Sequence, residues 1–296
     1  MTLPAPDLSD ELRPEHLDPA TFAFYRGCMK ALNEARCEYL VGGAYAFARY
    51  TAIERHTKDF DIFCRQRDVD PILSVLERLG CQTDRAFPHW LAKAYNPGTA
   101  DFIDVIYSSG SGIAVVDDEW FTHSVPETVL GIPVRLCPAE EIIWSKGFIM
   151  ERERYDGNDV AHLLRARGKD LDWSRVLRRF GPHWRVLLSH LVLFGFVYPA
   201  ERDAIPAAVV QELLGRLERE AAETSGAEPV CHGTLLSNAQ YLVDLRHLGY
   251  RDARLAPEGP LTPQQVAGAL ATIGGADRRV RLRRRTSHRR RVKRRA

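Results

Sequence analysis

Two features that would assign this chain to a membrane or secreted class are missing from its sequence. The longest apolar run, within Val186–Tyr198, is interrupted by Ser189 and His190 and is shorter than the roughly 20 residues that a membrane span needs. The first 18 residues are acidic and lack the basic and then apolar order of a secretory signal, so we expect none. These absences favour a cytoplasmic protein that makes no contact with a membrane.

Paired cysteines and metal-type histidine spacings are also missing. The six cysteines are scattered, with no CxxC pair, and most lie inside apolar runs, so we expect buried free thiols in a reducing cytoplasm. Histidines without metal-ligand spacing are better suited to core or surface roles than to catalysis. This applies to His162, His183, His190, His232 and His247.

Charge is distributed very unevenly along the 296 residues, which are enough for one large domain or two smaller ones. The last 19 residues, Arg278–Ala296, contain 12 Lys or Arg and no acid, and the rest of the chain has 29 bases against 39 acids, a net charge of −10. The tail has no apolar periodicity, so we expect it to be disordered. It is either an electrostatic arm for nucleic acid or another polyanion, or an extension without a role.

The stretch Tyr39–Phe63 carries the first candidate site. An apolar strand is predicted over Cys37–Val41, and Gly42 and Gly43 follow where the chain must turn into a helix over Ala44–Tyr50. Glycines allow a sharp turn and a close approach of backbone N–H groups to a ligand, and the following helix N-terminus favours an anion such as a triphosphate. Most Gly-Gly pairs are nevertheless only turns.

Two carboxylates stand one residue apart in the next predicted strand. Residues i and i+2 of a strand point to one face, so Asp59 and Asp61 are expected to be neighbours on the same side. Two like charges held so close are explained by a divalent cation such as Mg²⁺ between them. Alternatively, Asp59 caps a turn and pairs with Lys58 or Arg55, but this accounts for neither Asp61 nor the third carboxylate below.

A predicted hairpin supplies that third carboxylate. Trp90–Tyr95 and Asp101–Tyr107 flank the turn Asn96-Pro97-Gly98. In the second arm, Asp104 lies between apolar neighbours, where an ionised carboxylate is costly unless it is paired or bound to a metal. Asp101, at the mouth of the strand, is expected to be solvated.

The order of these motifs resembles the nucleotidyltransferase superfamily of the DNA polymerase beta type. In that order, a Gly-Gly pair is followed by Asp-x-Asp at a strand end and then by an Asp on a later strand. The sequence segments LVGGAYA and TKDFDIF are most similar to those of bacterial minimal nucleotidyltransferases, including AbiEii-type abortive-infection toxins of toxin-antitoxin systems. CPAEEIIWSKGFIMERERYDGNDVAHLL is similar to that group's helical segment. The resemblance covers about Tyr39–Leu164.

The resemblance implies a reaction and a role for each matching residue. Asp59, Asp61 and Asp104 would hold two Mg²⁺ ions, or Mn²⁺ in their place, and Asp104 would help to deprotonate the acceptor hydroxyl. Gly42, Gly43, Lys58 and Lys146 would bind the nucleoside triphosphate, ATP among the candidates. Many members have Gly-Ser at the phosphate loop, whereas Gly43 and Ala44 here offer no hydroxyl.

Structural alternatives exist for the residues of the helical segment. Lys146 follows a Pro-Ala-Glu-Glu helix start, and an exposed lysine in an ion pair is nearly as good an interpretation as a phosphate ligand. Asp156 and Asp159 precede the apolar run Val160–Leu164, and we expect both to cap a helix.

Beyond Leu164 the sequence predicts mainly helices. Apolar residues recur at helical spacing over four segments, with prolines near starts and glycines near stops: Trp173–Phe180, Pro182–Phe194, Pro206–Ala222 and Thr234–Leu248. A linker over Arg254–Thr262 then precedes a short helix over Pro263–Ile273. We expect an α/β fold, with a small mixed β-sheet core flanked by helices, then an all-helical C-terminal region and the basic tail. The predicted divisions are 1–165, 166–253, 254–277 and 278–296.

Three functions therefore compete. The leading hypothesis is metal-dependent transfer of a nucleoside monophosphate from a triphosphate to an acceptor, which is a protein hydroxyl, a tRNA end or a small molecule such as an antibiotic. A catalytically weak nucleotide- or RNA-binding protein on the same fold is the second. The third, an Asp-x-Asp glycosyltransferase, is disfavoured by the Gly-Gly at the strand-to-helix junction.

Overall fold

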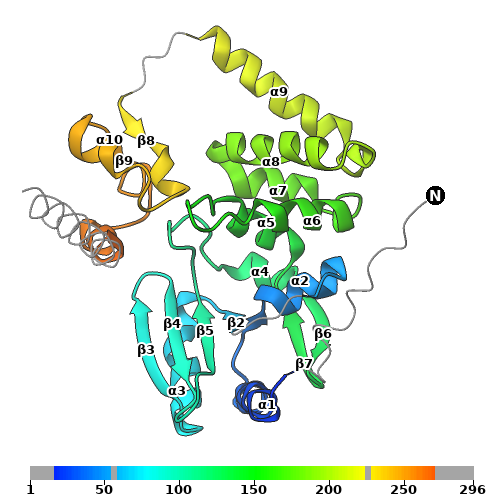
Figure 1. Ribbon diagram of the computed structural model, residues 1–296, viewed down its shortest axis with the longest axis vertical. Helices are drawn as coiled ribbons and strands as arrows, with labels where there is room; N and C mark the ends of the chain where they lie inside the picture. The colour runs from blue at the N-terminus through cyan, green and yellow to red at the C-terminus, as the bar shows by residue number, and fades with distance from the viewer. Residues whose placement is uncertain (1–16, 55–58, 224–227, 271–296) are drawn as a thin grey trace, which may run out of the picture.

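A seven-stranded mixed sheet forms the base of the molecule in the computed structural model, which describes residues 17–54, 59–223 and 228–270 (Figure 1). The strand order is β3-β4-β5-β2-β1-β7-β6. β2 runs parallel to β5 and antiparallel to β1, and β1 runs parallel to β7. The strands are β1 Leu40–Val41, β2 Phe60–Phe63, β3 Gln82–Phe87, β4 Leu91–Tyr95, β5 Phe102–Ile106, β6 Val125–Val129 and β7 Ile132–Leu136.

Helices α1 (Pro19–Glu34) and α3 (Val69–Arg78) pack against each other beside the sheet. The sequence predicts a helix over 18–36 with Asp18 as its N-cap. The carboxylate of Asp18 accepts a hydrogen bond of 2.8 Å from the N–H of Ala20, so α1 begins at this cap. Tyr25 of α1 is buried and lies 5.0 Å, centroid to centroid, from the ring of Phe60 in β2. The sequence also predicts a helix over 69–79. The helices predicted over 18–36, 69–79 and 44–50 are confirmed as α1, α3 and α2 (Gly43–Thr51) to within two or three residues.

The predicted hairpin is confirmed as the antiparallel pair β4 and β5. Strands β3, β6 and β7 were not predicted. β6 and β7 are joined by Leu130 and Gly131, both of which have positive φ, at 49° and 74°. A two-residue loop with two positive φ angles matches the right-handed twist of a hairpin, so the Leu130-Gly131 junction explains why these short segments pair.

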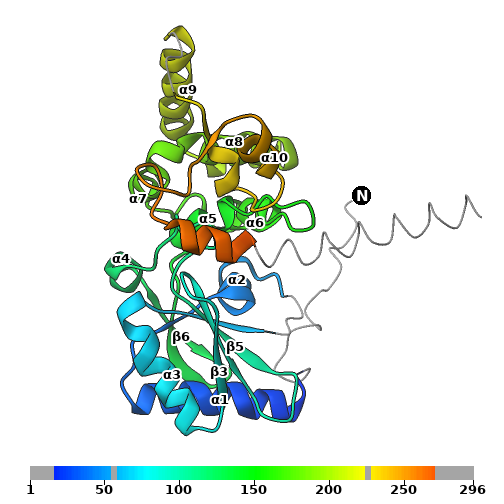
Figure 2. The same ribbon diagram turned by 90° about the vertical axis from the view of Figure 1, so that its left-hand side faces the viewer.

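The helices after the sheet lie above it in both views (Figures 1 and 2). The helices predicted over 173–180, 182–194 and 206–222 are confirmed as α7, α8 and α9. Glu141 of α5 is fully buried and lies 3.2 Å from Arg179 and 3.6 Å from Arg175 of α7, so a buried ion-pair network joins the two helices. The helices are α4 Asp118–Thr122, α5 Ala139–Gly147, α6 Gly157–Arg167, α7 Trp173–Phe180, α8 Trp184–Val197 and α9 Ala207–Ala222, with 3₁₀ turns η2 Gln66–Asp68, η3 Gly181–His183 and η4 Arg202–Ala204.

Residues 228–270 form a compact C-terminal segment beside α5 and α8 (Figure 1). The prediction of one continuous helix over Thr234–Leu248 is wrong. The chain forms a 3₁₀ turn, η5 (His232–Leu235), and a short helix, α10 (Leu242–His247), with non-helical residues between them. The helix breaks because the Ser237 hydroxyl and the Asn238 N–H both donate to the carboxylate of Glu151. Two short parallel strands, β8 (Val230–Cys231) and β9 (Arg251–Asp252), also interrupt this mostly helical region.

The stretch predicted to be a linker contains a buried arginine. Arg254 is fully buried, and its guanidinium donates to Asp252 at 2.6 Å and to Asn238 at 2.7 Å. A helix follows over 263–270, as predicted, up to the last residue described in this part of the chain. The division of the chain into domains stays a prediction.

Of the six free cysteines, four are buried, as expected, and Cys37 and Cys231 are partly exposed. Among the described helices, none is long and apolar enough to cross a membrane. Lys58 and the predicted basic tail Arg278–Ala296 lie outside the described residues.

Candidate active site

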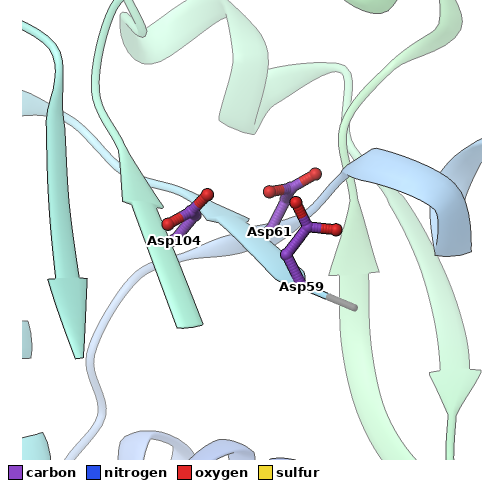
Figure 3. A group of neighbouring side chains, drawn as sticks. All are labelled: Asp59, Asp61 and Asp104. Atoms are coloured by element: carbon purple, nitrogen blue, oxygen red, sulfur yellow. The ribbon is translucent and has the colours of Figure 1, made fainter. Parts of the chain in front are cut away.

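The register of β2 and β5 brings the three candidate carboxylates together. Asp61 is the register partner of Asp104 in the parallel pair, and Asp59 stands immediately before β2, two residues from Asp61. Each carboxylate offers an oxygen, and these oxygens lie within 4.8 Å of one another. Figure 3 shows the three side chains pointing to the same side of the strands. The convergence follows from the alternation of side chains in a strand, whereas the chemical roles of the three residues stay predictions.

Like charges and burial make this site costly without a cation. The pKa of Asp61 is raised to about 7 by burial and by the charges of Asp59 and Asp104, against the opposing effect of Lys146 and Arg154. Burial also raises the pKa of Asp104. A divalent cation bound between the carboxylates would offset this repulsion, and ionised carboxylate oxygens are the ligands that hard cations such as Mg²⁺ or Mn²⁺ prefer. The residues present therefore fit the predicted metal.

Gly42 and Gly43 are required by packing against β2. Gly43 has φ +53°, and a Cβ atom built there would lie 2.0 Å from Oδ2 of Asp61. A Cβ atom at Gly42 would lie 2.3 Å from the ring of Phe63, and the N–H of Gly42 donates to the carbonyl of Asp61 at 3.0 Å. The two glycines thus let the start of α2 touch the acidic strand, and their contact with a phosphate stays a prediction.

Lys146 near the end of α5 lies in an ion-pair cluster. Its ammonium is 2.8 Å from Oδ2 of Asp156 and 2.8 Å from Oδ2 of Asp159. The expectation that these two aspartates cap α6 is wrong for Asp156: it occupies the N-cap position, but its side chain accepts from Lys146 and Arg154 and caps no helical N–H. Paired charges stabilise burial of both carboxylates, so the ion-pair interpretation of Lys146 is the one observed.

Sequence reasoning missed two cations at this site. Lys93 of β4 donates to Oδ1 of Asp104 at 2.5 Å, and its ammonium lies 4.0 Å from the centre of the Phe102 ring. The guanidinium of Arg154 donates to both carboxylate oxygens of Asp156, at 3.0 and 3.1 Å. The signal for Lys93 was a lone lysine in the otherwise apolar strand LAKAY, opposite the arm that carries Asp104. Arg154 stood among several arginines and acids without any such signal.

The C-terminal segment holds the loop from which Arg154 projects. The N–H of Met150 donates to the carbonyl of Leu236 at 3.0 Å, and the N–H of Asn238 donates to Oε1 of Glu151 at 2.7 Å. These bonds tie the loop between α5 and α6 to residues far along the chain. The segment 228–270 is therefore part of the support of the candidate site.

No protein-family model and no curated protein match this chain. Among solved structures, the solution structure of the antibiotic-resistance factor ANT(2'')-Ia is 18% identical, covering 70% of this chain and 95% of that one, with a TM-score of 0.36. The lincosamide antibiotic adenylyltransferase LnuA is 12% identical (47% and 94% covered, TM-score 0.35). An antigenic nucleotidyltransferase-like protein from Paracoccidioides brasiliensis is 14% identical (64% and 96% covered, TM-score 0.40). At identities and TM-scores this low, the function has to be inferred from the geometry of the site.

Proposed function

We propose that this protein is a metal-dependent nucleotidyltransferase, which moves a nucleoside monophosphate from a nucleoside triphosphate to an acceptor hydroxyl. The observation that supports it most directly is the convergence of Asp59, Asp61 and Asp104 on one side of two adjacent parallel strands (Figure 3). The resemblance of the stretch 39–164 to minimal nucleotidyltransferases supports the same reaction. AbiEii-type toxin activity is the narrower form of this proposal.

The three aspartates would hold two divalent ions. When bound, such ions stabilise negative charge on the attacking and leaving oxygens of an in-line transfer. The acceptor oxygen forms a bond to the α-phosphorus while the bond from that phosphorus to its bridging oxygen breaks, and pyrophosphate leaves. Asp104 takes the acceptor proton, a role for which the pKa raised by its burial suits it.

The residues around the triad would position the nucleotide. Gly42 and Gly43 place the N-terminus of α2 against Asp61, where backbone N–H groups favour phosphate oxygens. Lys58 and Lys146 are the proposed triphosphate contacts. Lys146 is already paired with Asp156 and Asp159. We therefore assign it to the electrostatic potential at the site at least as much as to direct contact with the triphosphate.

Incubation with triphosphates labelled at the α-phosphate tests the proposal. Each of the four nucleotides is offered with Mg²⁺ or Mn²⁺ and with three acceptor pools: protein extract, total RNA and small molecules. We expect α-label, but no γ-label, on one pool, and loss of this label in Asp61→Asn and Asp104→Asn. Asp101→Asn is the matched control, because Asp101 pairs with Thr21 at 2.8 Å outside the triad. Binding of nucleotide without any transfer of label would instead support the weakly catalytic nucleotide- or RNA-binding protein.

A further inference from the structure

A row of charged side chains crosses four strands at the candidate site. Asp84 of β3 is the register partner of Lys93 in β4, Lys93 is the partner of Asp104 in β5, and Asp104 is the partner of Asp61 in β2. Register partners on adjacent strands present their side chains to the same face, close enough to interact. Lys93 therefore stands between two acids, next to the triad.

Of these two acids, Lys93 is bound to the one that belongs to the triad. Its Nζ atom lies 2.5 Å from Oδ1 of Asp104, and the two side chains are only 20% and 12% exposed. The ring of Phe102 lies 4.0 Å from the same ammonium and adds a cation–π contact. Such a shielded contact fixes the carboxylate of Asp104 and leaves its second oxygen for another ligand.

The ion pair also sets the charge that a metal ion meets. Three ionised carboxylates and the Lys93 ammonium carry a net charge of −2, which a single divalent ion neutralises. The nearby Lys146 and Arg154 are paired with Asp156 and Asp159, so this group of two cations and two carboxylates adds no net charge to the site. A second divalent ion would thus enter a site that is already neutral, unless a ligand brings further negative charge.

We propose that Lys93 is a positioning residue that acts as an internal counter-cation. It holds Asp104 in place and limits the nucleotide-free site to one divalent ion, so that the second ion enters with the triphosphate. This inference rests on the metal site of the proposed function and adds an order of binding to it.

Titration of the nucleotide-free protein with Mn²⁺, followed by the electron paramagnetic resonance signal of the free ion, tests the proposal. We expect one ion per chain in the wild type and in Lys93→Arg, which keeps the charge. Lys93→Met and Lys93→Gln should bind two ions per chain over the same Mn²⁺ range, which requires the affinity for the second ion to rise at least about tenfold over its weak binding in the wild type, because an adjacent positive charge has been removed. Asp84→Asn and Lys169→Met are matched controls. Asp84 is exposed at the end of the row, and Lys169 pairs with Asp203 on the surface, so both should titrate like the wild type.

Equal stoichiometry and affinity in the wild type and in a folded Lys93→Met or Lys93→Gln protein would overturn the role of Lys93. Near-ultraviolet circular dichroism establishes that each variant is folded. Failure of the proposed function is distinguishable, because then neither the wild type nor any variant binds Mn²⁺ in a manner that Asp61→Asn abolishes.

Discussion

Gly43 lies against the carboxylate of Asp61, and the space between them is too small for a single methyl group: a Cβ atom at Gly43 would be 2.0 Å from Oδ2. The glycine pair and the acidic strand are therefore one structural unit. The position of Asp61 depends on the absence of a side chain at the start of α2.

Gly43→Ala should lower the free energy of unfolding by at least about 2 kcal/mol, because φ of +53° is strained for alanine and the new methyl group displaces Asp61. It should also weaken Mn²⁺ binding. Gly249→Ala is the control: its φ of +77° also imposes strain, but no atom lies within 4 Å, so we expect about 1–2 kcal/mol from the backbone alone and unchanged Mn²⁺ binding. Urea denaturation and Mn²⁺ titration measure both effects, and equal behaviour of the two variants would contradict the proposed contact.

Asp61→Asn should stabilise the metal-free protein at alkaline pH. Because the pKa of Asp61 is raised in the folded state from 3.8 to about 7, the folded protein binds the extra proton, and the wild type loses stability as pH rises between these values. Because Asp61→Asn removes the charge, the variant avoids this loss. Its free energy of unfolding should exceed that of the wild type by up to about 4 kcal/mol above pH 7 and by little near pH 4. Thermal melts in chelator at several pH values measure the difference.

The same variant should lose any stabilisation by Mg²⁺, since a ligand that binds only the folded state stabilises it by mass action. If the three carboxylates formed only a structural cluster, Asp61→Asn would instead break stabilising contacts and lower the melting temperature with or without metal. A mutant that melts lower in chelator, together with a wild type that ignores Mg²⁺ and triphosphate, would end the enzyme assignment.

Lys146→Met should destabilise the protein even without nucleotide, by about 3–5 kcal/mol, because it leaves the buried carboxylates of Asp156 and Asp159 with an uncompensated charge. Arg154→Ala removes a side chain that is 66% exposed and should cost no more than about 1 kcal/mol. Chemical denaturation without nucleotide gives both values, and addition of Asp159→Asn should restore part of the loss. If Lys146 served only the phosphates, its removal would leave this unfolding curve unchanged.

Deletion of Arg278–Ala296 should flatten the salt dependence of RNA binding. Twelve positive charges release counterions from phosphates on binding, whereas the remaining chain has a net charge of −10 and should bind poorly. Binding isotherms at several salt concentrations, for the full chain and the truncated one, give the two slopes. The same steep slope in both proteins would exclude the arm hypothesis.

The parts of the site that could be predicted from sequence are those set by local periodicity. Alternation in a strand places Asp59 and Asp61 on one side, and the Asn96-Pro97-Gly98 turn identifies the hairpin that brings in Asp104. Helical spacing likewise located α1, α3 and α7–α9. These features depend on residues a few positions apart, where backbone geometry dictates the outcome.

The features that were missed depend on tertiary partners. Lys93 acquires its importance from a cross-strand neighbour, and Asp156 prefers Lys146 and Arg154 to the helix end it was expected to cap. The helix predicted over Thr234–Leu248 gives way at Ser237 and Asn238 because Glu151, far away in sequence, binds both. Local propensity is overridden in each case by a contact that only the folded chain creates.

Because Asp61 pairs with Asp104 across β2 and β5, metal uptake by the proposed site would report on the docking of these strands during folding. Neither strand alone assembles the three carboxylates, and a slip of one residue would put Ile103 or Val105 opposite Asp61. In a stopped-flow refolding experiment, uptake of Mn²⁺ would therefore mark the moment at which the β4–β5 hairpin docks in register on the strand that follows α2, separately from the formation of the helices.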